Sequence, residues 1–368
     1  MNIARTIAVA RKEFIQIKRD PISMALAFLL PLILLFIFGY AISMDIDRIT
    51  VAVADNDKSS QSRGFVNSMT ASGYFTNIGY TDNESQLASL VDAGKAKVGV
   101  VFPNDFSRNL VSGVPAPLQV IVDGADANTA TIAIGYMAAA AARFTSESAP
   151  GIRPVIEPRV RVWYNEDLKS RNFIVPGLIA VILSVIAALL TSLTIAREWE
   201  RGTMEQLIST PVKTVELVTG KIIPYFAIGF VDMAFSVGVA VFLFKTPLRG
   251  SVVLLMALSC VFLFGLLSLG ALISIIARSQ LPASQFSLVA TFLPAFLLSG
   301  FIISIANMPL VLQYITNVIP ARYFVAILKG IFLKGSGLAD VAYDAFLLLV
   351  FGIVVFTAAN LKFVKRIG

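Results

Sequence analysis

Long apolar runs alternate with short charged segments along most of the chain. A transmembrane helix needs about 20 mostly apolar residues, because about 1.5 Å of rise per residue must cross roughly 30 Å of hydrocarbon. Six stretches meet this requirement: Ile22–Met44, Phe173–Ala196, Ile222–Phe244, Ser251–Ala277, Gln285–Ile305 and Ala342–Asn360. The pattern therefore predicts an α-helical membrane protein with six transmembrane helices. The first run is too long for a signal-peptide core, so we expect it to remain as an anchor.

The composition supports a membrane protein and disfavours an enzyme. Hydrophobic residues make up 57% of the chain and charged residues 14%, against about 45–50% and about 25% in soluble proteins. Histidine is absent and Cys260 is the single cysteine. The sequence thus lacks the commonest general base and metal ligand, and it has no pair of cysteines for a disulfide.

The distribution of lysine and arginine predicts the orientation in the membrane. The segments placed inside hold Arg5, Arg11, Lys12, Lys18, Arg19, Arg197, Arg201, Lys213, Lys221, Arg278, Lys362, Lys365 and Arg366. The short loops placed outside hold only Lys245, Arg249, Arg322, Lys329 and Lys334. Cytoplasmic loops are enriched in basic residues, so both termini are expected in the cytoplasm. The net charge of +7 then reflects topology, and we expect no nucleic-acid partner.

The segment Asp45–Asn172 is more charged than the rest and carries soluble-type patterns. Short β-type runs bounded by turn residues occur at Ile49–Ala54, Lys97–Phe102, Leu118–Val122 and Val160–Tyr164. Helical patterns lie between them, at Ser59–Ala71, Glu84–Asp92 and Asp126–Phe144. Such alternation predicts an inserted extracytoplasmic α/β domain over residues 45–172. Asp123-Gly124-Ala125-Asp126 could suggest a metal site, but we favour a turn that leads into a helix cap.

The N-terminal residues 1–21 predict a cytoplasmic amphipathic helix before the first transmembrane helix at 22–44. Ala4–Lys18 mixes apolar and charged positions, among them Arg11, Lys12, Glu13 and Phe14, and Pro21 follows. A basic amphipathic helix beside a span usually lies in the headgroup plane. A frayed, purely topogenic tail is the alternative.

The second span ends in an unusually charged segment, which runs from Ala196 to Pro211. It holds Arg197, Glu198, Glu200, Arg201, Gly202 and Glu205. We expect Thr203–Ser209 to form a short helix that exposes Glu205 and buries Met204, Leu207 and Ile208. Carboxylates gain nothing from anionic lipid, so a protein partner would explain them. An ordinary helix end with internal ion pairs explains them equally well.

Two further segments are informative. Asp232 lies about ten residues into the third span, where a carboxylate costs about 2.5–3.5 kcal/mol on insertion scales. It could contact a cationic substrate or take part in a proton step, or it could form a hydrogen bond with Ser184 or Thr191. Residues Met308–Phe332 are too polar and too broken to cross. We expect short helices there at the outer surface, or a lid that dips back.

Several motifs together resemble ABC-2 type exporter permeases, the membrane subunits of ATP-driven efflux pumps. The strongest is REWERGTMEQLISTP, from Arg197 to Pro211. ARKEFIQIKRDP, VDGADANTA, SGFIISIANMP and IPARYF match in the same order, so the resemblance covers nearly the whole chain. The large extracytoplasmic insert is typical of the multidrug-exporter branch.

The resemblance implies a mechanical role within the last part of the chain, residues 173–368. The cytoplasmic coupling segment 197–221 would dock on a separate ABC ATPase subunit, assisted by the N-terminal helix. ATP and Mg²⁺ would bind that subunit, because this chain has no G-x-x-x-x-G-K-[ST] motif. The chain itself would bind no cofactor. It would work in a bacterial inner membrane as a dimer with an identical or related permease, and with a periplasmic adaptor protein as a further partner.

The resulting hypothesis is a permease subunit that moves an amphipathic or lipophilic, drug-like compound out of the cell. Two alternatives from other classes stay open. One is a membrane sensor whose extracytoplasmic domain binds a ligand, although no kinase, cyclase or DNA-binding domain follows it. The other is an ion-coupled secondary transporter that uses Asp232. Dependence on a partner ATPase separates the three hypotheses.

Overall fold

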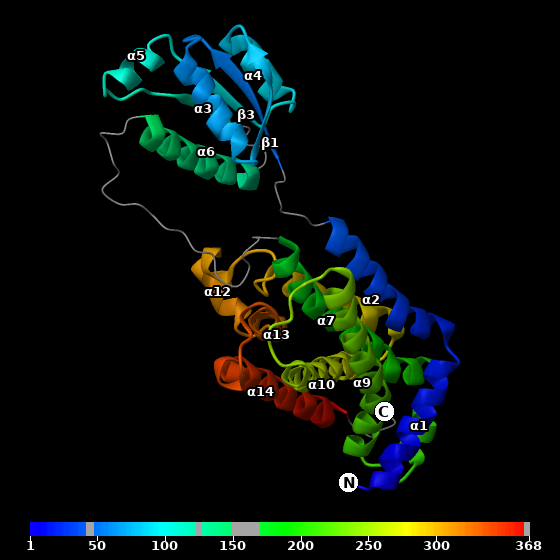
Figure 1. Ribbon diagram of the computed structural model, residues 1–368. Coiled ribbons are helices and arrows are strands. Elements are labelled where there is room, and N and C mark those ends of the chain that lie inside the picture. Colours follow the sequence, from blue (N-terminus) through cyan, green and yellow to red (C-terminus); the bar gives the residue numbers. More distant parts are fainter. Residues whose placement is uncertain (42–47, 123–126, 149–169, 364–368) are drawn as a thin grey trace. The chain divides into compact units, whose positions relative to one another are not determined.

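The chain forms two compact units (Figure 1). The computed structural model describes residues 1–41, 48–122, 127–148 and 170–363. Met1–Ser43 and Val162–Gly368 together form the first unit, and Met44–Arg161 form the second. The second unit is therefore inserted into the first along the sequence.

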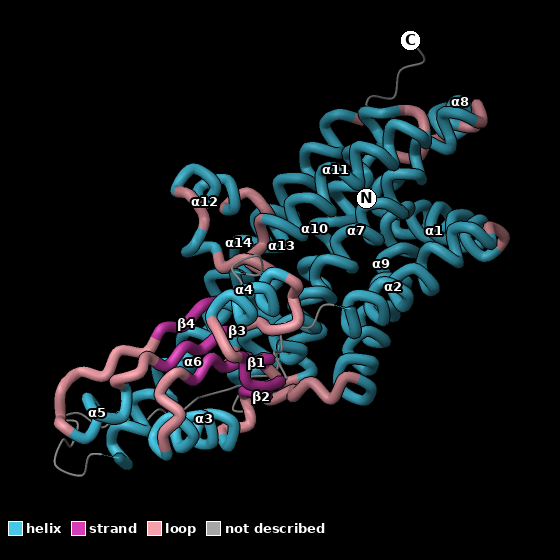
Figure 2. Tube along the Cα trace, turned by 90° about the horizontal axis from the view of Figure 1, so that it is seen from above, coloured by secondary structure: helices cyan, strands magenta, loops and turns pink. Residues whose placement is uncertain are grey.

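The first unit is a bundle of helices (Figure 2). Its elements are α1 (Ile3–Lys18), α2 (Pro21–Ala41), α7 (Ser170–Glu200), α8 (Met204–Ser209), α9 (Thr214–Gly238), η1 (Val239–Leu243), α10 (Val252–Ala277), α11 (Gln280–Leu297), η2 (Ile305–Asn307), α12 (Leu310–Thr316), α13 (Pro320–Lys329), η3 (Gly330–Lys334) and α14 (Leu338–Lys362). The helices η1 and η3 are π-helical turns that extend α9 and α13.

Four helices in the described part of the chain are long and apolar enough to cross a membrane: α7, α9 with η1, α10 and α14. The bent pair of α12 and residues 320–334 would add a fifth. The prediction of six spans is thus supported only in part. Helix α11 ends at Leu297 rather than near Ile305, and the chain turns at Gly300, whose φ is +76°. Within α2, the described apolar stretch Ala27–Tyr40 is shorter than a full span.

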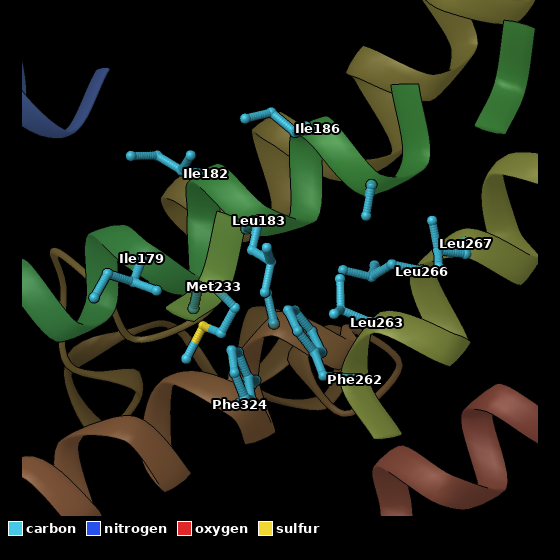
Figure 3. Packing of buried hydrophobic residues seen from close by; sticks show 14 of the residues in the cluster. Ile179, Ile182, Leu183, Ile186, Met233, Phe262, Leu263, Leu266, Leu267 and Phe324 are labelled. Carbon is cyan, nitrogen blue, oxygen red and sulfur yellow. The ribbon is translucent and has the colours of Figure 1, made fainter. Parts of the chain in front are cut away.

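Helix α7 is the centre of this bundle. Of its most apolar stretch, 94% of the residues are buried, against 17% for α14. Figure 3 shows Ile179 and Leu183 of α7 near Met233 of α9 and Phe262 of α10. An apolar helix that is buried all round must be surrounded by protein. A displacement of the end of α7 would therefore also displace the helices that pack around it.

Residues 308–332 form short helices, as predicted, but α13 is not a surface helix. The axes of α12 and the α13–η3 segment differ by 86°. Phe324 of α13 is fully buried and stacks on Phe262 of α10, with 4.0 Å between the ring centroids. Its amphipathic sequence has one apolar face that packs into the bundle, so this helix dips into the core.

The second unit is a four-stranded sheet covered by helices. Its elements are β1 (Ile49–Asp55), α3 (Ser60–Ala71), β2 (Phe75–Thr81), α4 (Glu84–Asp92), β3 (Val98–Phe102), α5 (Phe106–Val111), β4 (Gln119–Val122) and α6 (Ala127–Ser148). The strand order is β2-β1-β3-β4; β1 is parallel to β2 and β3, and β4 is antiparallel to β3.

Alternate residues of β1 contribute to two different cores, since side chains of a strand point to opposite faces. Val51 and Val53 pack with α3 and α6, while Ala52 and Ala54 pack with α4. The sequence patterns did not predict β2 or α5. The strand β2 is an edge strand with few apolar residues, and α5 has only six residues.

Two expectations lie outside the described residues. They are the turn at Asp123–Asp126 and the strand at Val160–Tyr164. The extracytoplasmic position of the second unit stays a prediction.

Candidate functional site

The charged segment after α7 forms a turn and a short helix. Glu200 ends α7, and Gly202 adopts a left-handed conformation with φ of +67°, which glycine reaches without steric cost. Helix α8 follows from Met204 to Ser209. Met204 is buried, Leu207 and Ile208 are partly buried, and Glu205 is exposed. The short amphipathic helix predicted here is therefore present, with its charged side outward.

Glu198 is at the centre of a buried ion network. Its side chain is only 3% exposed. Lys12 of α1 donates a 2.6 Å hydrogen bond to Glu198 Oε1, and Lys221 of α9 donates one of 3.3 Å to the same oxygen. The Thr203 hydroxyl donates to Glu198 Oε2. Since both oxygens of this carboxylate have partners inside the chain, Glu198 is not presented to the solvent.

Lys221 joins Glu198 to a second buried carboxylate, that of Glu13 on α1. The distance from Lys221 Nζ to Glu13 Oε2 is 2.8 Å, and the Tyr225 hydroxyl donates to Glu13 Oε1 at 3.2 Å. Buried charges cost much free energy unless they are paired and hydrogen-bonded. The two carboxylates and two lysines satisfy one another, and they bind α1, α7 and α9 together at one end of the bundle.

Lys12, Glu13 and Glu198 were predicted from the sequence as site residues, whereas Lys221 and Tyr225 were not. Lys221 was used only as one of the basic residues that predict the orientation in the membrane. It stands at the start of an apolar span, where a buried lysine must have a partner. The bonded residues are up to 212 positions apart in sequence. Their meeting could be found only in the folded bundle.

Helix α1 packs along α9 with little space between the backbones. A Cβ atom at Gly220 of α9 would lie 2.7 Å from Val9 Cβ and 2.9 Å from the Thr6 carbonyl oxygen. Glycine therefore permits the close approach of α1. The opposite side of α1 exposes Arg11 and Phe14, which leaves an amphipathic outer face.

The N-terminus of α1 also contacts the coupling segment. Arg5 Nη1 donates to the Pro211 carbonyl oxygen at 2.5 Å. Glu216, in the first turn of α9, accepts hydrogen bonds from the backbone N–H groups of Asn2 at 2.6 Å and Lys213 at 2.9 Å. The coupling segment and α1 are thus connected at both ends of α1.

Glu200 connects the end of α7 to α11. Its carboxylate accepts hydrogen bonds from the Ser279 hydroxyl at 2.7 Å, from the Gln280 backbone N–H at 2.9 Å and from the Gln280 side-chain amide. A carboxylate at a helix N-terminus satisfies donors that the helix cannot. Arg197 pairs with Asp20 at 3.0 Å, and the Arg278 guanidinium lies 5.0 Å from the Trp199 ring centroid.

The remaining charges of this segment face outward. Arg201 and Glu205 are exposed, and Glu205 has no ion-pair partner among the described residues. Gln206, Ser209 and Pro211 share this exposure. The α8 surface, defined here as Arg201, Glu205, Gln206 and Ser209, is therefore the part of the segment that a partner could contact.

Asp232 lies deep in the bundle, on α9. It is 2% exposed, and its Oδ2 atom has no hydrogen-bond partner among the described residues. Ser184 and Thr191, the predicted alternatives, donate instead to the backbone carbonyls of Ala180 and Ala187 in their own helix. The hydrogen bond proposed from the sequence is absent between these described residues. The unpaired carboxylate oxygen leaves the functional interpretation open.

An apolar cavity of about 210 Å³ lies between α2, α7 and α11. Its walls are Leu30, Leu34, Phe38, Leu178, Val181, Ile182, Val185, Leu288, Phe292 and Phe296. All of these side chains are hydrocarbon, so the cavity suits a lipophilic group rather than a charged one.

Similarity to known proteins extends over both units. The model of the ABC-2 family transporter protein matches residues 22–361. The probable multidrug ABC transporter permease YbhS of Escherichia coli (strain K12) is 39% identical over 90% of this chain and 89% of its own length. The probable multidrug ABC transporter permease YbhR is 31% identical over 99% of both chains, and the inner membrane transport permease YhhJ 29% over 86% of both. Both come from the same organism.

Proposed function

This chain belongs to the ABC-2 family of transporter proteins and is a permease of that family, and from this premise we propose that it is the membrane subunit of an ATP-driven exporter. Separate ABC ATPase subunits hydrolyse ATP with Mg²⁺, and this chain transports without being an enzyme itself. It works as a dimer with an identical or related permease. It lies in a bacterial inner membrane with both termini in the cytoplasm.

The α8 surface is the docking site for the ATPase. Four observations support this assignment: α8 is amphipathic, Met204 anchors it to the bundle, Glu205 is exposed without an ion-pair partner in the described part of the chain, and a turn at Gly202 separates the helix from α7. Pro211 ends the surface and is held by Arg5. A partner can therefore push on α8 without first breaking ion pairs inside this chain.

The buried ion network transmits the motion. When α8 moves, Thr203 pulls on Glu198, and Glu198 is bonded to both α1 and α9. Glu200 carries the same displacement to α11. We therefore assign α1, α7, α8 and α9 to one moving body, in which Glu198 couples the elements without touching the ATPase.

The cargo is an amphipathic or lipophilic compound. The apolar cavity between α2, α7 and α11 supports this class of cargo, and the three relatives named above are permeases, two of them named as probable multidrug permeases. Asp232 places a carboxyl group inside the bundle, which in its ionised form would favour a cationic group on the cargo. The second unit shapes the exit or contacts a periplasmic adaptor protein.

The observation that carries the proposal is the family match over residues 22–361. The test is ATP-driven uptake of a lipophilic dye into inverted vesicles that contain this chain with or without a co-expressed Walker-motif ATPase. We expect uptake only when both proteins are present, and co-purification of the two. ATP-independent uptake that follows an ion gradient would instead support the secondary transporter, and either that result or failure to bind any ATPase would overturn the proposal.

The role of Asp232 has its own test. The change Asp232→Asn keeps the shape of the side chain and removes its charge, so export of cationic dyes should fall at least about tenfold, equivalent to about 1.4 kcal/mol. Export of neutral dyes should change little. Transport assays with matched cationic and neutral dyes measure the ratio, and an equal effect on both would refute a charge role.

A further inference from the structure

A second cavity, of about 350 Å³, lies within the second unit. Its lining residues belong to α3, α5 and α6 and to the loop between α5 and β4. Its main walls are Phe65, Phe106, Leu110, Leu118, Ala141 and Phe144. This volume falls in the range of about 300–1,000 Å³ that is usual for small-molecule sites.

The lining sets the chemistry of an occupant. Among the described residues no charged side chain lines the cavity, and of those that do line it only Thr145 has a polar side chain. The Thr145 hydroxyl already donates to the Ala141 carbonyl oxygen at 2.8 Å. Apolar cavities hold water poorly, and one of about 150 Å³ is large enough to bind benzene. An uncharged hydrocarbon or aromatic group therefore fits better than water or an ion.

The walls are held by aromatic packing, so the cavity is formed before any ligand arrives. Phe65 contacts Phe102 and Phe144 edge to face, with centroid distances of 5.8 Å and 5.4 Å. Phe102 also contacts Phe106 edge to face at 5.0 Å. Phe102 is fully buried in the core of the unit. The floor of the cavity is thus the fixed core rather than a movable surface side chain.

Part of the lining is exposed to solvent. Val114, in the loop after α5, lines the cavity and is 54% exposed. A lipophilic molecule would therefore meet an apolar side chain as it enters the cavity. Val111, the last residue of α5, is 74% exposed and is not part of this lining.

We propose that this cavity of the second unit binds an uncharged lipophilic small molecule of the class that the permease exports. This deepens the proposed function and rests on it for the identity of the class. The unit would then hold cargo itself, rather than serve only as a wall of the exit. A lipid acyl chain has the same apolar chemistry and is the competing occupant of the cavity.

The test measures access to the cavity in the full chain, without any ATPase. In a Cys260→Ala background, Leu110→Cys places a thiol in the wall, and Val111→Cys places one on the neighbouring exposed position. Each variant reacts with a charged, water-soluble methanethiosulfonate in nanodiscs, with and without the uncharged probe N-phenyl-1-naphthylamine. With probe at ten times its Kd, labelling at position 110 should slow about tenfold, because only the free fraction reacts.

The rate of labelling at position 111 should not change when the probe is added. Ala141→Trp, which fills the cavity, should abolish the protection by the probe when it is added to the Leu110→Cys variant. Ala142→Trp, on the exposed side of the same helix, should preserve it. Equal rates at position 110 with and without probe would overturn the proposal. The proposal would also be overturned if the thiol at position 110 reacted slowly before any probe was added and reacted faster once lipid was removed. The cavity would then hold a lipid acyl chain. The vesicle uptake assay remains independent of either result.

Discussion

The end of α7 and the helix that follows it carry similar residues in opposite environments. Glu198 is buried, and Lys12, Lys221 and Thr203 all bond to it. Glu205, which lies in α8 after the turn at Gly202, is exposed and has no such partner among the described residues. The sequence motif that spans both residues therefore contains one buried, paired carboxylate and one exposed carboxylate.

The difference teaches how one charged segment can both receive a force and transmit it. An exposed carboxylate on α8 can meet a partner at little cost in stability, since surface charges contribute only about 0–1 kcal/mol. A buried carboxylate cannot do so without breaking its own ion pairs. We therefore assign docking to Glu205 and transmission to Glu198, and the following predictions test that division.

The largest expected effect comes from Glu198→Lys. It would place a third cation beside Lys12 and Lys221, so the free energy of unfolding should fall by about 3–5 kcal/mol. Thermal unfolding of the detergent-solubilised chain measures the loss. Glu205→Lys is the matched control, because it makes the same chemical change at an exposed site. Similar Tm values for the two variants would show that the buried network does not stabilise the bundle.

A smaller effect is expected from Gly220→Ala. The new Cβ would lie 2.7 Å from Val9 Cβ, so α1 must move away from α9 at a cost of about 1–3 kcal/mol. Limited trypsin digestion should cleave faster at Lys12, which is held against Glu198 in the parent chain. The control is Gly238→Ala at the other end of α9, where no atom lies within 4 Å of the added Cβ. Unchanged digestion would mean that α1 is not held here.

A double-mutant cycle sharpens the comparison further. Glu13→Gln, Lys221→Met and the double variant should show a coupling energy of about 0.5–3 kcal/mol in the free energy of unfolding, because the two groups are 2.8 Å apart in a buried site. The same cycle for Arg201 and Glu205 on the α8 surface should show coupling near zero. Additive effects at the buried pair would contradict the account.

The sequence predicted local structure better than it predicted contacts. The helices at 59–71 and 84–92 and the short amphipathic helix after Gly202 were found because caps, periodicity and glycine are local signals. The exposed position of Glu205 followed from the same periodicity. Strand β2 was missed, since an edge strand needs no apolar run.

The burial of Glu198 could not be predicted, because its partners Lys12 and Lys221 come from α1 and α9. A charged helix end looks the same in sequence whether it meets solvent or other helices. A segment that dips back was one of the two expectations for residues 308–332. The partner of Phe324 could not be predicted, because Phe262 stands more than sixty positions earlier in the sequence. Six spans were expected, and the described residues support four or five of them; α11 ends at Leu297, before a turn at Gly300.

The most direct test of the account is Glu205→Lys, with Glu205→Gln as the graded control. We expect an unfolding free energy within about 0.5 kcal/mol of the parent chain, as is usual for surface changes. We also expect weaker co-purification of the ATPase and loss of ATP-driven uptake in inverted vesicles, with Glu205→Gln intermediate. Full uptake by Glu205→Lys, with the ATPase still bound, would contradict the claim that α8 receives the force of ATP hydrolysis.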